Sequence, residues 1–214
     1  MELKQLLSSK RLSTVIGIIG PLLFVTLFTL EGLFRTGYNP TKMFISELSL
    51  GDSGWMQIIN FIIVGLSLLI FSRSIPEEFK TGRKLIKIIG FSLLISGPFV
   101  MEPTSTPLNQ LSFHGLVHSI FGAVVFTLIP ITCFVFFRYF SKNSKWHNFK
   151  WITLMTAMIT TIFVILLTAL TKNPSLANTY GNWQGFVQRG VIIPFMFWLP
   201  IFALKLYNKR VITS

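Results

Sequence analysis

Six separate blocks of apolar residues dominate the sequence, and each has about the 17–25 residues that a helix needs to cross a bilayer. The blocks are apolar all round and lack the polar stripe of a helix on a soluble protein. Only 12% of the residues are charged, whereas a soluble domain carries about a quarter. The sequence therefore predicts an all-α, polytopic transmembrane bundle of six helices that forms a single domain over residues 1–214. The expected helices span approximately residues 13–34, 55–72, 85–101, 113–137, 151–170 and 186–207.

The formal net charge of +12 is distributed very unevenly along the chain. Six spans place both termini on one side of the membrane, and that side carries 15 basic residues against three acids. The other side carries four of each. The positive-inside rule then predicts that both termini are cytoplasmic and that the protein is a multi-pass protein of the cell (cytoplasmic) membrane. Topology and anionic lipid headgroups account for this charge, so we expect the lipid bilayer as a partner and no nucleic acid.

A long polar segment rich in glycine, residues 37–54, separates the first two spans. We interpret it as a non-cytoplasmic loop that lies over the mouth of the bundle. The dipeptide Asn39-Pro40 is typical of a helix start, with Asn as the N-cap and Pro at the first helical position. A short helix from there would place Met43, Phe44 and Leu48 on one side, which could lie in the membrane interface.

The polar side chains of the spans gather near their non-cytoplasmic ends, within about two helical turns of that face. Polar groups inside a membrane are costly and normally face the bundle interior. The sequence therefore predicts an outward-facing polar pocket beneath the loop. In that pocket, Glu102 and Arg189 either pair across the mouth or remain separate charges at its rim. The candidate ligand-pocket residues are Asn39, Ser46, Asp52, Gln57, Asn60, Glu102, Gln188 and Arg189.

His114 and His118 are one helical turn apart and share a helix face. This spacing suits two ligands of a zinc ion, with Glu102 or Asp52 as a third ligand. The alternative interpretation is that both imidazoles form hydrogen bonds with polar neighbours such as Glu31, Asn60 or Gln188. The sequence contains neither an HExxH motif nor a pair of cysteines.

Several motifs together resemble one family. GYNP, ISELSLGDSGWMQIINF, a proline-rich acidic turn, HGLVH and GFVQR resemble the DUF998 family of six-helix bacterial and archaeal membrane proteins, from about Val15 to Lys205. That family usually has Asp-Pro where this chain has Glu102-Pro103. By this resemblance the matching positions are Asn39, Pro40, Ser46, Leu48, Ser49, Gly54, Trp55, Gln57, Asn60, His114, His118, Gln188 and Arg189.

These observations favour a protein that binds, senses or moves a small or lipid-like ligand at the outer leaflet. The alternative is a zinc-dependent membrane hydrolase that acts on a lipid or amide, with the His114/His118 pair as metal ligands. It is suggested by a distant similarity to the seven-helix ceramidase-like hydrolases, although a second acid–serine motif is missing here. A scaffold without a ligand is the third alternative. A channel is disfavoured because no span is polar along its full length.

Overall fold

The computed structural model describes residues 2–104 and 106–212, so residues 1, 105, 213 and 214 of the predicted domain lie outside it. The described residues form helices, turns and loops, with no strand among them. Short 3-10 helices lie at Ile45–Ser49 (η1), Glu77–Phe79 (η2), Leu108–Gln110 (η3), Ser144–Trp146 (η4) and Gly181–Trp183 (η5). The α-helices are Glu2–Phe34 (α1), Trp55–Ser72 (α2), Lys80–Ser96 (α3), Phe113–Ser141 (α4), His147–Lys172 (α5), Pro174–Tyr180 (α6) and Gln184–Ile212 (α7).

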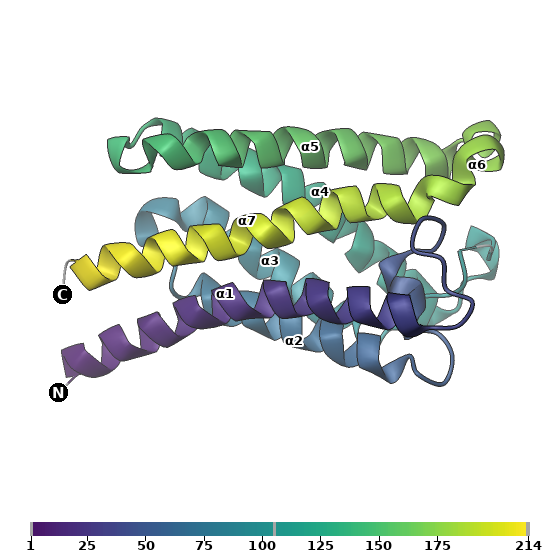
Figure 1. The fold of residues 1–214 in the computed structure, drawn as a ribbon, viewed down its shortest axis with the longest axis horizontal. Helices are drawn as coiled ribbons and strands as arrows, with labels where there is room; N and C mark the ends of the chain where they lie inside the picture. Colours follow the sequence, from purple (N-terminus) through teal and green to yellow (C-terminus); the bar gives the residue numbers. More distant parts are fainter. Residues whose placement is uncertain (1, 105, 213–214) are drawn as a thin grey trace.

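The six long helices form a closed ring in the order α1, α2, α3, α4, α5, α7, with α7 packing back against α1. They run roughly along one axis, and both chain termini lie at the same end of the bundle (Figure 1). The opposite end carries α6 and the connections 35–54 and 97–112. A ring of this kind can enclose a site only along its axis or at one of its ends.

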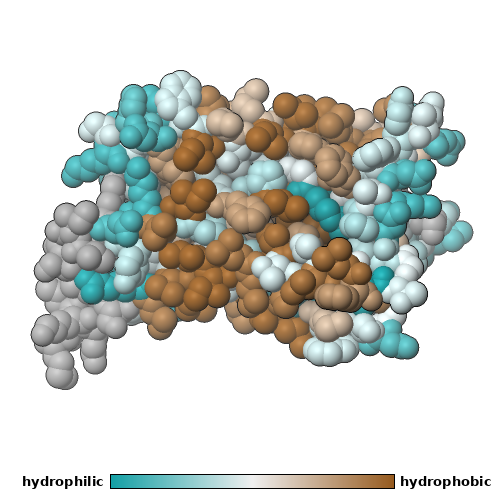
Figure 2. All heavy atoms as spheres, in the orientation of Figure 1, coloured by the Kyte–Doolittle hydropathy of each residue, from teal (hydrophilic) through white to brown (hydrophobic). Residues whose placement is uncertain are grey.

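The outer surface of the ring is suited to lipid. Five of the described helices, all of the ring except α3, are long and apolar enough to cross a membrane. On the face that Figure 2 shows, a broad and mainly apolar band covers the middle and hydrophilic residues gather towards the two ends. Exposed apolar side chains on the helices of the ring include Ile19, Ile120, Met155 and Ile162. The protein is therefore a multi-pass membrane protein.

The observed helices agree with the prediction at α2 and differ elsewhere for local reasons. α1 begins at Glu2 rather than near residue 13. α3 lies about one turn earlier than predicted, over Lys80–Ser96 in place of 85–101. Proline has no backbone N–H with which to continue a helix, and Pro98, which follows the C-cap Gly97, accordingly lies beyond the end of α3 and before Met101. α4, α5 and α7 each extend a few residues beyond the predicted limits.

The end of the bundle that carries the termini is filled by aromatic side chains. Phe140 stacks on Trp146 with ring centroids 4.6 Å apart, and Trp198 and Phe202 stack at 5.2 Å. Phe79 and Phe136 complete the cluster, and all these rings are almost fully buried. Such packing leaves no continuous path along the axis at this end, so any site in the ring lies towards the other end.

The segment 36–54 covers the opposite end of the ring, and we name it the cap. Its central element is η1, in which all five residues are buried. The Asn39 side chain accepts hydrogen bonds from the backbone of Thr41 and Lys42, as an N-cap does, but only a turn follows it and helical structure begins at Ile45. The cap thus lies in the mouth of the bundle, as expected, but η1 packs on the ring rather than in the membrane interface.

Candidate functional site

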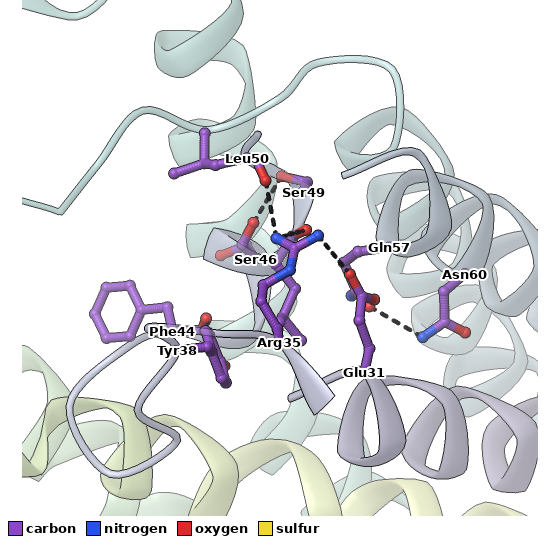
Figure 3. Close-up of polar contacts among 10 residues, drawn as sticks. Glu31, Arg35, Tyr38, Phe44, Ser46, Ser49, Leu50, Gln57 and Asn60 are labelled. Atoms are coloured by element: carbon purple, nitrogen blue, oxygen red, sulfur yellow. Dashed lines mark hydrogen bonds and ion pairs between the residues drawn. The ribbon is translucent and has the colours of Figure 1, made fainter. Parts of the chain in front are cut away.

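Arg35, one turn after Glu31 in the sequence, fastens one side of the cap. Its Nη1 atom donates to the carbonyl oxygens of Leu48 at 2.6 Å and Leu50 at 2.8 Å. Its Nη2 atom lies 2.9 Å from Glu31 Oε1, and the two side chains are only 17% and 6% exposed. Figure 3 shows the guanidinium between the Glu31 carboxylate and the Leu50 carbonyl. Both terminal nitrogens of this arginine therefore face partners within the protein, Nη1 through hydrogen bonds and Nη2 through the ion pair alone.

Arg189, near the start of α7, fastens the other side. Its Nη1 atom donates to the carbonyl oxygens of Pro40 at 2.7 Å, Met43 at 3.0 Å and Gly185 at 2.9 Å, and its Nη2 atom donates to the Tyr38 hydroxyl. Burial raises the pKa of Tyr38 above its ordinary value, and the positive charge of Arg189 offsets this only in part. The Tyr38 phenol therefore stays neutral and can itself donate to the Phe44 carbonyl at 2.9 Å.

Two further side chains satisfy the buried backbone of η1. Gln188 Oε1 accepts from the Ile45 amide at 2.7 Å. Glu47 Oε2 accepts from the Phe44 amide at 2.7 Å, and its other oxygen accepts from the Thr104 amide. Buried backbone groups without partners are costly, so these bonds explain why a loop so rich in polar residues remains ordered.

A small chamber lies beneath the cap and has a volume of about 40 Å³. The helices of the ring other than α5 contribute to its wall, and η1 closes it. Its polar lining comes from Ser46 of the cap, Ser96 of α3, His118 of α4 and Gln188 of α7. A water needs roughly 10–15 Å³ measured in this way, so the chamber accommodates a few waters and no lipid.

A much larger groove, of about 1000 Å³, lies between α1 and α2 beside the cap. Its walls are apolar and include Leu27, Leu30 and Phe34 of α1 and Trp55, Met56 and Ile59 of α2. Its polar end holds Glu31, Arg35 and Asp52. Ligand pockets commonly measure about 300–1000 Å³, and this groove is at the upper limit of that range.

Gln57 and Asn60 lie behind this groove, on the buried face of α2. Asn60 Nδ2 donates to the Phe24 carbonyl at 3.1 Å and to Gln57 Oε1 at 3.2 Å. Gln57 Nε2 and Asn60 Oδ1 are fully buried and have no hydrogen-bond partner. The pair joins α1 to α2, and neither residue lines the groove or the chamber.

The predicted zinc ligands do not fit a metal ion. His118 is buried and its Nδ1 lies 2.8 Å from the Phe99 carbonyl and 3.2 Å from that of Ser96, whereas His114 is exposed and packs against the Phe99 ring. Glu102 accepts from the Ser112 amide at 3.0 Å, and hydrogen bonding from Ser112 lowers the pKa of Glu102 below its ordinary value. Within residues 2–104 and 106–212, no three His, Cys, Asp or Glu side chains lie together as a metal site requires.

The eight predicted pocket residues thus separate into distinct groups. Ser46 and Gln188 meet at the chamber, and Asp52 is at the groove. Gln57 and Asn60 form the buried pair, whereas Asn39 and Arg189 shape and hold the cap. Glu102 caps the turn before α4 and forms no described ion pair with Arg189.

The candidate pocket predicted from the sequence left out four polar residues that contribute to the groove and the cap. The residues missed are Glu31, Arg35, Tyr38 and Glu47. The spacing of Glu31 and Arg35 by four positions is a recognisable signal for a helical ion pair. Tyr38 and Glu47 gave no comparable signal, because their partners are backbone carbonyls and amides brought close by the fold.

Comparison with known proteins identifies a family without adding a chemistry. The comparisons with curated proteins and with solved structures found no match. One family, described as "Protein of unknown function (DUF998)", matches residues 18–205, which is most of the chain. Since that match covers nearly every element of the ring and the whole cap, the protein belongs to the DUF998 family.

Proposed function

We propose that this protein binds a lipid-like amphiphile from the outer leaflet of the cytoplasmic membrane, in the groove between α1 and α2. The groove itself carries the proposal. It is large enough for a lipid chain, apolar along its walls, and lined beside the cap by the charged side chains of Glu31, Arg35 and Asp52. This arrangement matches the two parts of an amphiphile.

The location of the groove supports a lipid as its occupant. Leu30, Phe34, Trp55 and Ile59 are between 44% and 83% exposed, and they lie on helices that are long and apolar enough to cross a membrane. An apolar groove that faces acyl chains is filled by acyl chains rather than by water. Any selectivity of the groove among lipids therefore concerns the headgroup.

The proposal includes six spans with both termini in the cytoplasm. α3 is short, but it packs between α2 and α4 and links the two ends of the bundle. The unequal distribution of basic residues then assigns the end with the termini to the cytoplasm. The groove and cap would accordingly face the outer leaflet.

The other functions considered have less support. The chamber beneath the cap is far smaller than a lipid, and the zinc-dependent hydrolase lacks a fitting set of ligands among the described residues. The aromatic cluster at the other end of the ring argues against a channel. A scaffold would leave the polar end of the groove without a role.

Native mass spectrometry of the detergent-purified protein tests this proposal. Ile59→Trp fills the groove and should remove a co-purified lipid that the wild type retains. Ile165→Trp is the matched control, because Ile165 is 62% exposed on α5, away from the groove. If wild type and Ile59→Trp retain the same lipids in the same amounts, the groove is not the binding site.

A further inference from the structure

We infer that the groove selects a lipid whose headgroup carries a primary ammonium, such as phosphatidylethanolamine, over an anionic lipid such as phosphatidylglycerol. This inference rests on the proposed lipid site and concerns only what its polar end recognises. It follows from which charged atoms at that end are occupied and which are free.

Arg35, the basic residue that lines the groove, already has partners within the protein. Arg35 Nη1 is shared between two carbonyl oxygens of the cap, and Nη2 is paired with Glu31 Oε1. To bind a lipid phosphate, Arg35 would have to give up the cap or leave a carboxylate that is 6% exposed without its partner. Breaking a buried ion pair by removing one partner is strongly destabilising. The groove therefore offers an anionic headgroup little that it can use.

The two carboxylates of the groove, Glu31 and Asp52, have oxygen atoms that can accept further hydrogen bonds. Glu31 contributes Oε1 to the ion pair, and no hydrogen bond of the described residues reaches its Oε2. Asp52 is exposed at the rim, and no described residue donates to its carboxylate. Two carboxylates against one guanidinium give the polar end a net charge of −1.

An ammonium group complements this arrangement in charge and in hydrogen bonding. It carries three N–H donors and no acceptor, which suits the two carboxylates, Glu31 and Asp52, that line this end of the groove. Charge-assisted hydrogen bonds of this kind are stronger than neutral ones. A quaternary choline headgroup has the same charge and no N–H donor, so it should bind less well than ethanolamine.

Competition between lipids with matched acyl chains tests the selectivity by native mass spectrometry. Phosphatidylglycerol will also bind to the basic face at the other end of the molecule. Only the lipid that Ile59→Trp loses is therefore scored. We expect the wild-type protein to retain more phosphatidylethanolamine than phosphatidylglycerol, with phosphatidylcholine in between.

Two variants locate the selectivity at the polar end. Asp52→Asn should lower the preference for phosphatidylethanolamine about two- to five-fold, the range expected for an exposed charge pair. Glu78→Gln removes an exposed acid at the other end of the bundle and should change nothing. Glu31→Gln leaves Arg35 without its carboxylate and should shift the preference towards phosphatidylglycerol. If Glu31→Gln does not fold, the lipid preference of Asp52→Asn alone shows whether the polar end sets the selectivity.

The outcomes separate this inference from the proposed function. Equal retention of the two lipids, or a preference for phosphatidylglycerol at the Ile59-dependent site, would overturn the headgroup inference and leave the lipid site in place. An unchanged preference in Asp52→Asn would also overturn it. If no bound lipid depends on Ile59, the proposed function fails and the inference fails with it.

Discussion

Gln188 shows how a single polar side chain in this protein serves the backbone rather than a ligand. It comes from α7, yet its carbonyl oxygen satisfies the buried amide of Ile45 in the cap, 143 positions earlier in the chain. Arg35 and Arg189 act in the same way on other carbonyl oxygens of the cap. The sequence placed Gln188 and Arg189 in a candidate pocket and left Arg35 out. It could not indicate that their partners are backbone groups, because those partners depend on the path of the cap.

Replacing Gln188 by Leu should loosen the cap. The variant leaves the Ile45 amide buried and without an acceptor, which costs about 1–3 kcal/mol. Hydrogen–deuterium exchange of the detergent-solubilised protein should become faster at residues 40–50. Gln110→Leu is the control, since Gln110 is exposed at the same end of the bundle. Equal exchange in the two variants would show that Gln188 does not hold the cap.

Tyr38 should titrate above its ordinary pKa of about 10, since burial disfavours the phenolate. Because the pKa of Tyr38 is raised in the folded state, the contribution of the neutral phenol to the free energy of unfolding is complete below about pH 10. That contribution is lost as the pH rises through the folded-state pKa. The absorbance at 295 nm should show this in the difference between wild type and Tyr38→Phe. A midpoint at or below pH 10 would contradict the burial of the phenol beside Arg189.

At the scale of elements, the apolar blocks predicted the long helices, whereas a short polar motif in the cap predicted a helix that does not form. The dipeptide Asn39-Pro40 predicted a helix start, but the chain there forms a turn. Asn173-Pro174, which has the same two residues, does begin a helix, α6, and Asn173 caps it. The dipeptide favours a local geometry in both places. Whether a helix follows depends on packing that neither dipeptide encodes.

The close contact between α7 and the cap can be tested at one glycine. A Cβ atom at Gly185 would lie 2.3 Å from the Met43 carbonyl oxygen and 2.7 Å from that of Pro40. Gly185→Ala should therefore displace the cap and lower the stability by about 0.5–3 kcal/mol, measured as thermal unfolding in detergent. At Gly181 the same methyl group meets open space, so Gly181→Ala should stay within about 0.5 kcal/mol of wild type. Equal stability of both variants would contradict the contact.

At the scale of the whole molecule, the ring organises two ends of different character. Aromatic side chains fill the end with the termini, and a cap held by two arginines closes the other. Composition and hydropathy predicted the all-helical membrane fold, because those properties are averaged over many residues. The groove could not be predicted in this way. It arises where α1 and α2 meet beside the cap, and its charged end depends on which atoms the cap has already occupied.

The topology itself is decided by three cysteine variants in a Cys133→Ala background, since the buried Cys133 is the only cysteine of the chain. Asp52→Cys, Gln110→Cys and Lys142→Cys each replace an exposed residue in a different connection. Six spans with cytoplasmic termini predict that a membrane-impermeant maleimide labels the first two in intact cells, and the third only after permeabilisation.

Each alternative gives a different pattern. If α3 did not cross the membrane, every later connection would change sides, so the reagent would label the variants at 52 and 142 but not at 110. If the bundle were inverted, only the variant at 142 would be labelled. Labelling of 52 and 110 on the same side of the membrane therefore reports that the short α3, with its 17 residues, is a span, and labelling on opposite sides reports that it is not. The reactivity at 52 reports whether the groove faces the outer leaflet, which the proposed lipid site requires.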